Sequence, residues 1–328
     1  VSLVVTFSEV VSISDTPCIT LVNGATAVYT DGSGSDTLTF SYTAAEGDSS
    51  ADVATALSDA LSGGGIADAA GNALVTQALD DINPSGLLVV DTTAPTVVSV
   101  VYGTNDGTLK AGETVTLVVT LSEVTTVTGT PTLALANAGT ATYTSGSGTN
   151  TLTFSYTAAS GQDTTDLKTA LTQSLNGVLT DLAGNNVIAT SFDAVNPTGT
   201  LVVDTTGPTV TAFSPADGAS LVAVGSNIVL TLSEAITRGT GTISLYSGSA
   251  TGTLIESFDA ATSNRLTIAN TTLTLDPTNT LTNNTRYFVV FSPGAFTDLA
   301  GNAYAGTNTY DFATLPLGNT ITGTANAD

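Results

Sequence analysis

The sequence predicts an all-β protein made of β-sandwich modules that follow one another head to tail. Three observations support this: apolar and polar residues alternate in many short runs, Gly, Asn, Asp and Ser separate the runs, and whole phrases recur. Alternation places one set of side chains on each face of a strand, and short strands between turn residues are typical of a sandwich. With 328 residues, 41% of them hydrophobic, the chain can form two or three such domains.

Internal repetition defines the modules. Three pairs of phrases line up: VSLVVTFSEV (1–10) with VTLVVTLSEV (115–124), DTLTFSYTAAEG (36–47) with NTLTFSYTAASG (150–161), and DTTAPTV (91–97) with DTTGPTV (204–210). A third copy keeps only NIVLTLSEAI (227–236) and TDLAGNAY (297–304). We therefore predict modules at residues 1–91, 92–204 and 205–315, followed by a tail over 316–328.

The clearest strand signal lies near the start of each module. One face of each predicted strand carries the apolar residues, which are Val1, Leu3, Val5 and Phe7, then Val115, Leu117, Val119 and Leu121, then Ile228, Leu230 and Leu232. Two later segments, 52–61 and 166–175, instead have apolar residues at helical spacing. Each is expected to be a short helix or a turn between strands.

Composition excludes several classes of function. The 28 acidic residues outnumber the 5 basic ones, and the net charge of −23 argues against nucleic acid as a partner, because phosphates are bound by Lys and Arg. Without histidine, the chain has neither a Ser-His-Asp triad nor an imidazole zinc site. We expect no enzyme activity, because the acidic residues recur once per module, as joints between modules do.

The ends of the sequence suggest a longer polypeptide. No apolar run reaches the roughly 18 residues of a membrane span, and residues 1–10 lack the features of a signal peptide. The sequence opens without methionine inside a strand-like run. We expect it to be part of a longer chain.

Topology predicts that acidic residues meet at the joints. In an immunoglobulin-like sandwich, the second strand ends at the pole where the chain arrives from the preceding module, and the loop before the last strand lies there too. These positions are occupied by Asp91, Glu123 and Asp181 at the first joint, and by Asp204, Glu234 and Asp298 at the second. Module one carries Glu9 and Asp68 without an incoming linker.

Converging carboxylates predict a bound cation. Two of them about 4 Å apart repel by roughly 1 kcal/mol in water, and by more where they are partly buried. Ca²⁺ binds about six to eight oxygens from carboxylates, amide side chains and carbonyls, so Asn72, Asn185 and Asn302 are predicted to add oxygen ligands. The alternative is that D-x-A-G-N only forms turns, with Gly at positive φ and Asp or Asn capping the turn.

The same phrases carry a family resemblance. Modules two and three resemble bacterial immunoglobulin-like domains, the tandem repeats of large secreted adhesins and surface-layer proteins. The third resembles the S-layer type through SPADGA (214–219), NIVLTLSEAI, GTGTISLY (239–246) and TDLAGNAY. The tail GNTITGTANAD (318–328) resembles the approach to RTX calcium repeats, although no G-G-x-G-x-D repeat follows.

The resemblance implies an extracellular structural or adhesive spacer at the bacterial surface. Its modules would be stiffened by calcium at the joints already named, with neighbouring modules of the same chain as partners. Two alternatives remain open: a filament or surface-layer subunit linked by strand donation, and a carbohydrate-binding module. Strand donation is considered because module one has no counterpart of residues 96–114, and an uncovered sheet edge attracts a strand.

Overall fold

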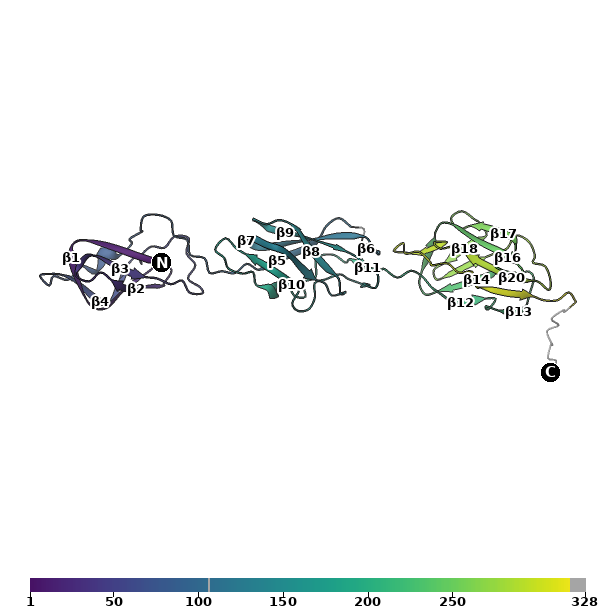
Figure 1. Cartoon of the computed structure of the whole chain (residues 1–328), viewed down its shortest axis with the longest axis horizontal. Coiled ribbons are helices and arrows are strands. Elements are labelled where there is room, and N and C mark those ends of the chain that lie inside the picture. Colours follow the sequence, from purple (N-terminus) through teal and green to yellow (C-terminus); the bar gives the residue numbers. More distant parts are fainter. Residues whose placement is uncertain (106, 319–328) are drawn as a thin grey trace, which may run out of the picture.

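The computed structural model describes residues 1–105 and 107–318. Figure 1 shows three β modules in a row along the longest axis, joined by short linkers, with the N-terminal module in purple and the C-terminal one in green and yellow. Each module has a separate hydrophobic core. The all-β prediction of tandem immunoglobulin-like sandwiches is therefore confirmed. The described part of the chain contains no helix with the length and hydrophobicity needed to cross a bilayer.

Module one is built around a single four-stranded sheet with the order β2-β3-β1-β4. Its elements are β1 (Ser2–Thr20), β2 (Thr26–Asp31), β3 (Ser35–Ser41), β4 (Leu61–Asp68) and the 3-10 helix η1 (Thr76–Leu79). The long β1 changes partner along its length. Its first part pairs with β3 as far as Thr6, and after a register shift its second part pairs with β4 from Val11 onward.

Module two repeats this arrangement and adds a strand in front of it. Its elements are β5 (Val97–Tyr102), β6 (Thr108–Leu109), β7 (Thr114–Ala134), β8 (Thr140–Ser145), β9 (Thr149–Thr157), β10 (Leu175–Thr180), η2 (Ala189–Phe192) and β11 (Val202–Val203). The strand β7 is the counterpart of β1, and it pairs with both β9 and β5. The short β6 and β11 form a separate parallel pair.

The added strand changes how deeply the predicted apolar face is buried. Val115, Leu117, Val119 and Leu121 are all at most 2% exposed, because β5 closes the sandwich beside them. The matching residues of module one lie in β1 or, for Val1, directly before it, and within the described residues no strand covers them in this way. There Leu3, Val5 and Phe7 are only partly buried and Val1 is exposed.

Module three divides its strands between two larger sheets. Its strands are β12 (Val210–Ser214), β13 (Ala219–Val222), β14 (Ile228–Leu232), β15 (Ile236–Arg238), β16 (Thr242–Ser247), β17 (Thr253–Asp259), β18 (Leu266–Ala269), β19 (Thr272–Leu275), β20 (Arg286–Phe291), β21 (Phe296–Asp298) and β22 (Asp311–Thr314). The sheets have the orders β12-β14-β19-β18 and β13-β22-β20-β16-β17, and β15 pairs with β21. Ile228, Leu230 and Leu232 face the core as predicted.

The segments with helical spacing are turns and extended stretches, so the helical alternative was wrong. Their backbone N–H groups bond other parts of the module: Val53 donates to the Leu88 carbonyl and Thr55 to that of Ile82. Leu167 and Thr169 do the same in module two. Because these donors are already engaged across the sandwich, no helical hydrogen-bond ladder forms. The predicted RTX-like tail lies almost wholly outside the described residues.

Candidate metal centre at the joints between modules

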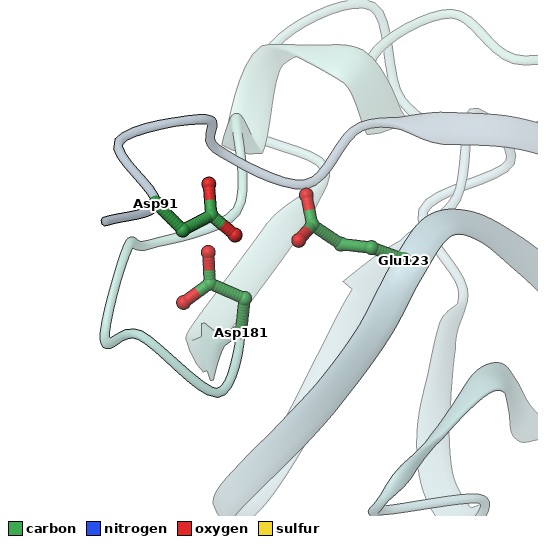
Figure 2. A group of neighbouring side chains, drawn as sticks. All are labelled: Asp91, Glu123 and Asp181. Atoms are coloured by element: carbon green, nitrogen blue, oxygen red, sulfur yellow. The ribbon is translucent and has the colours of Figure 1, made fainter. Parts of the chain in front are cut away.

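Three carboxylates from two modules meet at the first joint. Asp91 comes from the end of module one, Glu123 lies within β7, and Asp181 directly follows β10. Figure 2 shows the three carboxylates turned toward one another. One oxygen from each lies within 4.8 Å of the others. The structure therefore brings together the residues that topology predicted at this pole.

The second joint has the same construction, although the module behind it differs in sheet order. Asp204 enters from module two, Glu234 follows β14, and Asp298 ends β21. Their oxygens also lie within 4.8 Å of one another. The arrangement thus depends on the three short segments that carry the acidic residues. It is the same in both modules although their sheet orders differ.

A tight loop holds the buried carboxylate in place at each joint. Asp181 is 4% exposed, and its Oδ1 accepts the Asn185 backbone N–H at 2.8 Å. Gly184, at φ 97°, supplies the left-handed conformation that this turn needs. Asp298 is 1% exposed and accepts the Asn302 N–H at 2.8 Å. Turn chemistry and cation binding are compatible here, because a carboxylate oxygen retains further lone pairs.

The loop asparagines connect the loop to the linker. The Asn185 Nδ2 donates to the Asp181 Oδ2 at 2.7 Å and to the Asp91 backbone carbonyl at 2.9 Å. Asn302 makes the equivalent bonds to Asp298, at 2.9 Å, and to the Asp204 carbonyl, at 2.8 Å. Their amide nitrogens are directed at the carboxylates, so in this structure both side chains hold the acidic groups in position; that they also supply oxygen ligands stays a prediction.

A second pair of residues, which sequence analysis overlooked, fixes the linker beside the glutamate. The Thr96 N–H donates to Ser122 Oγ at 3.0 Å, and the Ser122 N–H donates to the Thr96 carbonyl at 2.9 Å. Thr209 and Ser233 form the same pair at the second joint, at 3.0 and 2.8 Å. The recurrence of T-x-P-T ahead of each S-E, as in DTTAPTV and DTTGPTV, was the available signal.

The glutamate at each joint has a pKa that is raised by its surroundings. Burial raises the pKa of Glu123, and the nearby charges of Asp91 and Asp181 raise it further. Burial likewise raises the pKa of Glu234, with added contributions from Asp298 and Asp204. The charged form of the glutamate at each joint is therefore disfavoured unless a positive charge lies nearby.

Within the described residues, no basic side chain forms an ion pair with these carboxylates, and Lys110 Nζ only approaches the backbone of Gly301 in the loop of the second joint. Within residues 1–105 and 107–318, the ion pairs are Lys110 with Glu113, Arg265 with Asp276, and Arg286 with Asp311. None of them includes a carboxylate of either joint. A cluster of one buried and two half-buried carboxylates, none of them in an ion pair among the described residues, fits a hard divalent cation, because Ca²⁺ prefers oxygen ligands.

Module one has the loop, but no complete cluster is present there among the described residues. Asp68 accepts the N–H of Ala70 and both the backbone and side-chain N–H groups of Asn72, and these hydrogen bonds, that of the Asn72 side chain first, lower its pKa. Glu9 is exposed. Among the described residues, no third carboxylate joins these two in a cluster.

The comparison with known families concerns module three. Residues 204–314 match the bacterial Ig-like domain family. No curated protein matches the chain. Bacterial Ig-like domains are typically extracellular or surface-associated and serve as structural modules without enzymatic activity. The fold of the chain is that of tandem Ig-like sandwiches, and module three is the part that the family describes.

Proposed function

We propose that the protein is an extracellular spacer of Ig-like modules, structural or adhesive in role, whose joints are stiffened by Ca²⁺. The observation that carries the proposal is that three carboxylates from two modules lie within 4.8 Å at both joints. A cation bound there would contact the linker aspartate together with two groups of the next module. It would therefore restrain the angle between the modules as well as neutralise the charge.

The sequence resemblances support the same role. The likeness of module three to S-layer-type domains, and of residues 318–328 to the approach to RTX repeats, fits a secreted surface protein. The single-file arrangement of modules in Figure 1 suits a spacer that holds another part of a chain at a distance. The net charge of −23 also favours association with cations over anionic partners.

Thermal unfolding of the whole chain during a calcium titration tests the proposal. With free calcium at about 100 times its dissociation constant, each site should stabilise the folded state by about 2.7 kcal/mol. The chelator EDTA should reverse the gain. An unchanged melting temperature across the titration would refute calcium binding at the joints.

Two matched variants assign the effect to the joints. Glu123→Gln removes one negative charge from the first cluster and should reduce the calcium response. Glu9→Gln changes the same S-E phrase in module one, where the described residues form no cluster, and should leave the response as in the unchanged protein. Equal responses in both variants would place the bound calcium elsewhere.

A further inference from the structure

Module one has an apolar groove where module two has a strand. The groove has a volume of about 500 Å³, and its lining includes Leu3, Val5, Ile19, Leu79 and Ile82. In module two, β5 occupies the equivalent place and buries Val100 to 4% exposure.

The edge of the sheet along this groove is unpaired within the described residues. Val1 exchanges two backbone hydrogen bonds with Tyr42, at 2.7 and 2.8 Å, so its peptide groups face β3. Because backbone groups alternate in direction along a strand, those of Val4 and Thr6 face the groove. The only strand that pairs with the Ser2 to Thr6 stretch in the described structure is β3.

Module two shows which kind of segment covers such an edge. There β5 runs antiparallel to β7, with Val100 opposite Val119 and Tyr102 opposite Leu117. The Tyr102 hydroxyl also donates to the Leu167 carbonyl. The residues of module one that match Val119 and Leu117 are Val5 and Leu3, and both line the groove.

The groove continues to the incomplete acidic pair. A second hollow, of about 210 Å³, shares Phe7, Ser8 and Leu74 with the first and extends to Glu9 and Asp68. Ser8 has the position that Ser122 holds in module two, where it bonds the linker at Thr96. A segment lying along both hollows would therefore place a residue equivalent to Asp91 beside the two acidic groups.

We propose that this groove binds an extended polypeptide segment of the same type as residues 91–102, which adds to β1 as an antiparallel strand. The segment is defined by an aspartate, a proline and then apolar residues at the positions of Val97, Val100 and Tyr102. Its aspartate completes a third carboxylate cluster with Glu9 and Asp68. Strand addition is independent of the proposed function, whereas cation binding at the third cluster rests on it.

Amide hydrogen exchange of the whole chain with a synthetic peptide of residues 91–104 tests strand addition. The amides of Val4 and Thr6 should exchange at least about tenfold more slowly in the peptide's presence, because they gain hydrogen-bond partners. The amides of Leu3 and Val5, which already face β3, should change little. A peptide carrying Val100→Asp should have no effect, since it would place a charge in the apolar groove.

A variant of the chain separates strand addition from simple covering of the face. Thr6→Pro removes an N–H that faces the groove while leaving the bonds to β3 in place, and proline is tolerated at a sheet edge. This variant should keep the unfolding transition of module one and lose the peptide. Equal peptide binding by the variant, or no slowing at Val4 and Thr6 in the unchanged chain, would overturn the proposal.

A fused chain tests the same geometry without a free peptide. A copy of residues 91–114 joined ahead of Val1 should give Val4 and Thr6 the protection that Val118 and Thr120 have in module two. Calcium should then stabilise module one of the fused chain, and Glu9→Gln should remove that stabilisation. In the unfused chain, Glu9→Gln should leave the calcium response unchanged. Slowed exchange without a calcium response at any joint would refute the proposed function but retain strand addition.

Hydrogen exchange of the unchanged chain at increasing protein concentration tests whether a second copy covers the groove. If Val4 and Thr6 become protected through self-association, and the peptide does not compete, then a second copy covers the groove through another segment. That result would also overturn the proposal.

Discussion

Modules one and three differ in an instructive way: module one is closer to module two in sequence, yet among the described residues only module three repeats the complete acidic cluster of module two. Module one repeats whole phrases of module two, including S-E-V and A-G-N. Module three differs in sequence and in sheet order, yet it presents Glu234 and Asp298 to Asp204 as module two presents its own pair to Asp91. The cluster thus depends on a linker that reaches the pole of the next module, and likeness between the sandwiches is not sufficient.

The largest expected effect comes from replacing the buried aspartate. In the presence of calcium, Asp298→Ala should destabilise module three by about 1.5–3 kcal/mol through the lost charge-assisted hydrogen bonds alone. Loss of a calcium ligand should add to this cost. In EDTA the loss should be smaller, because repulsion from Glu234 and Asp204 is relieved. Thermal unfolding under both conditions measures the difference.

The control for this prediction is Asp68→Ala in module one. It removes the same loop carboxylate in a module whose described residues form no cluster, so its effect should be the same with calcium as with EDTA. A calcium-dependent loss in this variant would show that the loop binds calcium without a linker.

A smaller effect is expected from the loop asparagines. Asn185→Ala removes the bond to the Asp91 carbonyl as well as the bond to Asp181, and should cost about 1 kcal/mol and loosen the first joint. X-ray scattering should then report a wider range of inter-module angles. Asn72→Ala, which bonds no linker, should leave the scattering profile unchanged, and equal profiles in all three proteins would contradict the clamping role.

The smallest effect concerns pH in the absence of metal. The folded-state pKa values of Glu123 and Glu234 are raised, so the folded protein binds these protons more tightly than the unfolded chain does. Stability should therefore fall as pH rises through the folded pKa values of these groups and recover on mild acidification. Calcium should reverse this trend, because protons compete with the cation.

Variants distinguish the titration of the two glutamates from the loss of stability at lower pH, called here the acid limb. The pKa of Asp68 and that of Asp163 are lowered by hydrogen bonds, so the stability they contribute is lost only at lower pH. The double variant Glu123→Gln, Glu234→Gln should abolish the gain on mild acidification and keep the acid limb. A gain that persists in this variant would point to other groups.

Sequence reasoning succeeded where a local pattern determines the structure. Alternation in residues 115–123 predicted a buried face, and the topology of a sandwich placed Glu123 and Asp181 at one pole. It failed where hydrogen bonds between residues distant in sequence determine the backbone conformation. The apolar spacing of residues 166–175 resembles that of a helix, but the N–H groups of Leu167 and Thr169 are bonded to distant carbonyls.

The orientation of Asn185 was also beyond the reach of sequence. Its residue type allows either the amide oxygen or the nitrogen to face the acidic groups. The position of the Asp91 carbonyl favours the nitrogen, and that position depends on how two modules meet. The partial burial of Leu3 and Val5, by contrast, agrees with the missing counterpart of residues 96–114 that the repeat comparison revealed, although the alternation of β1 alone does not show it.

The paired bonds between linker and module also determine how the protein would carry mechanical load. Tension applied along the row of modules reaches the linker first, where Thr96 is bonded to Ser122 and the Asp91 carbonyl to Asn185. These bonds lie in series with the sheets and are fewer than the bonds that hold a sheet together, so we expect the joints to yield before the sandwiches do. A cation held by both sides would act as a reversible crosslink at each of these weak points, and force would be shared among joints before any module unfolds.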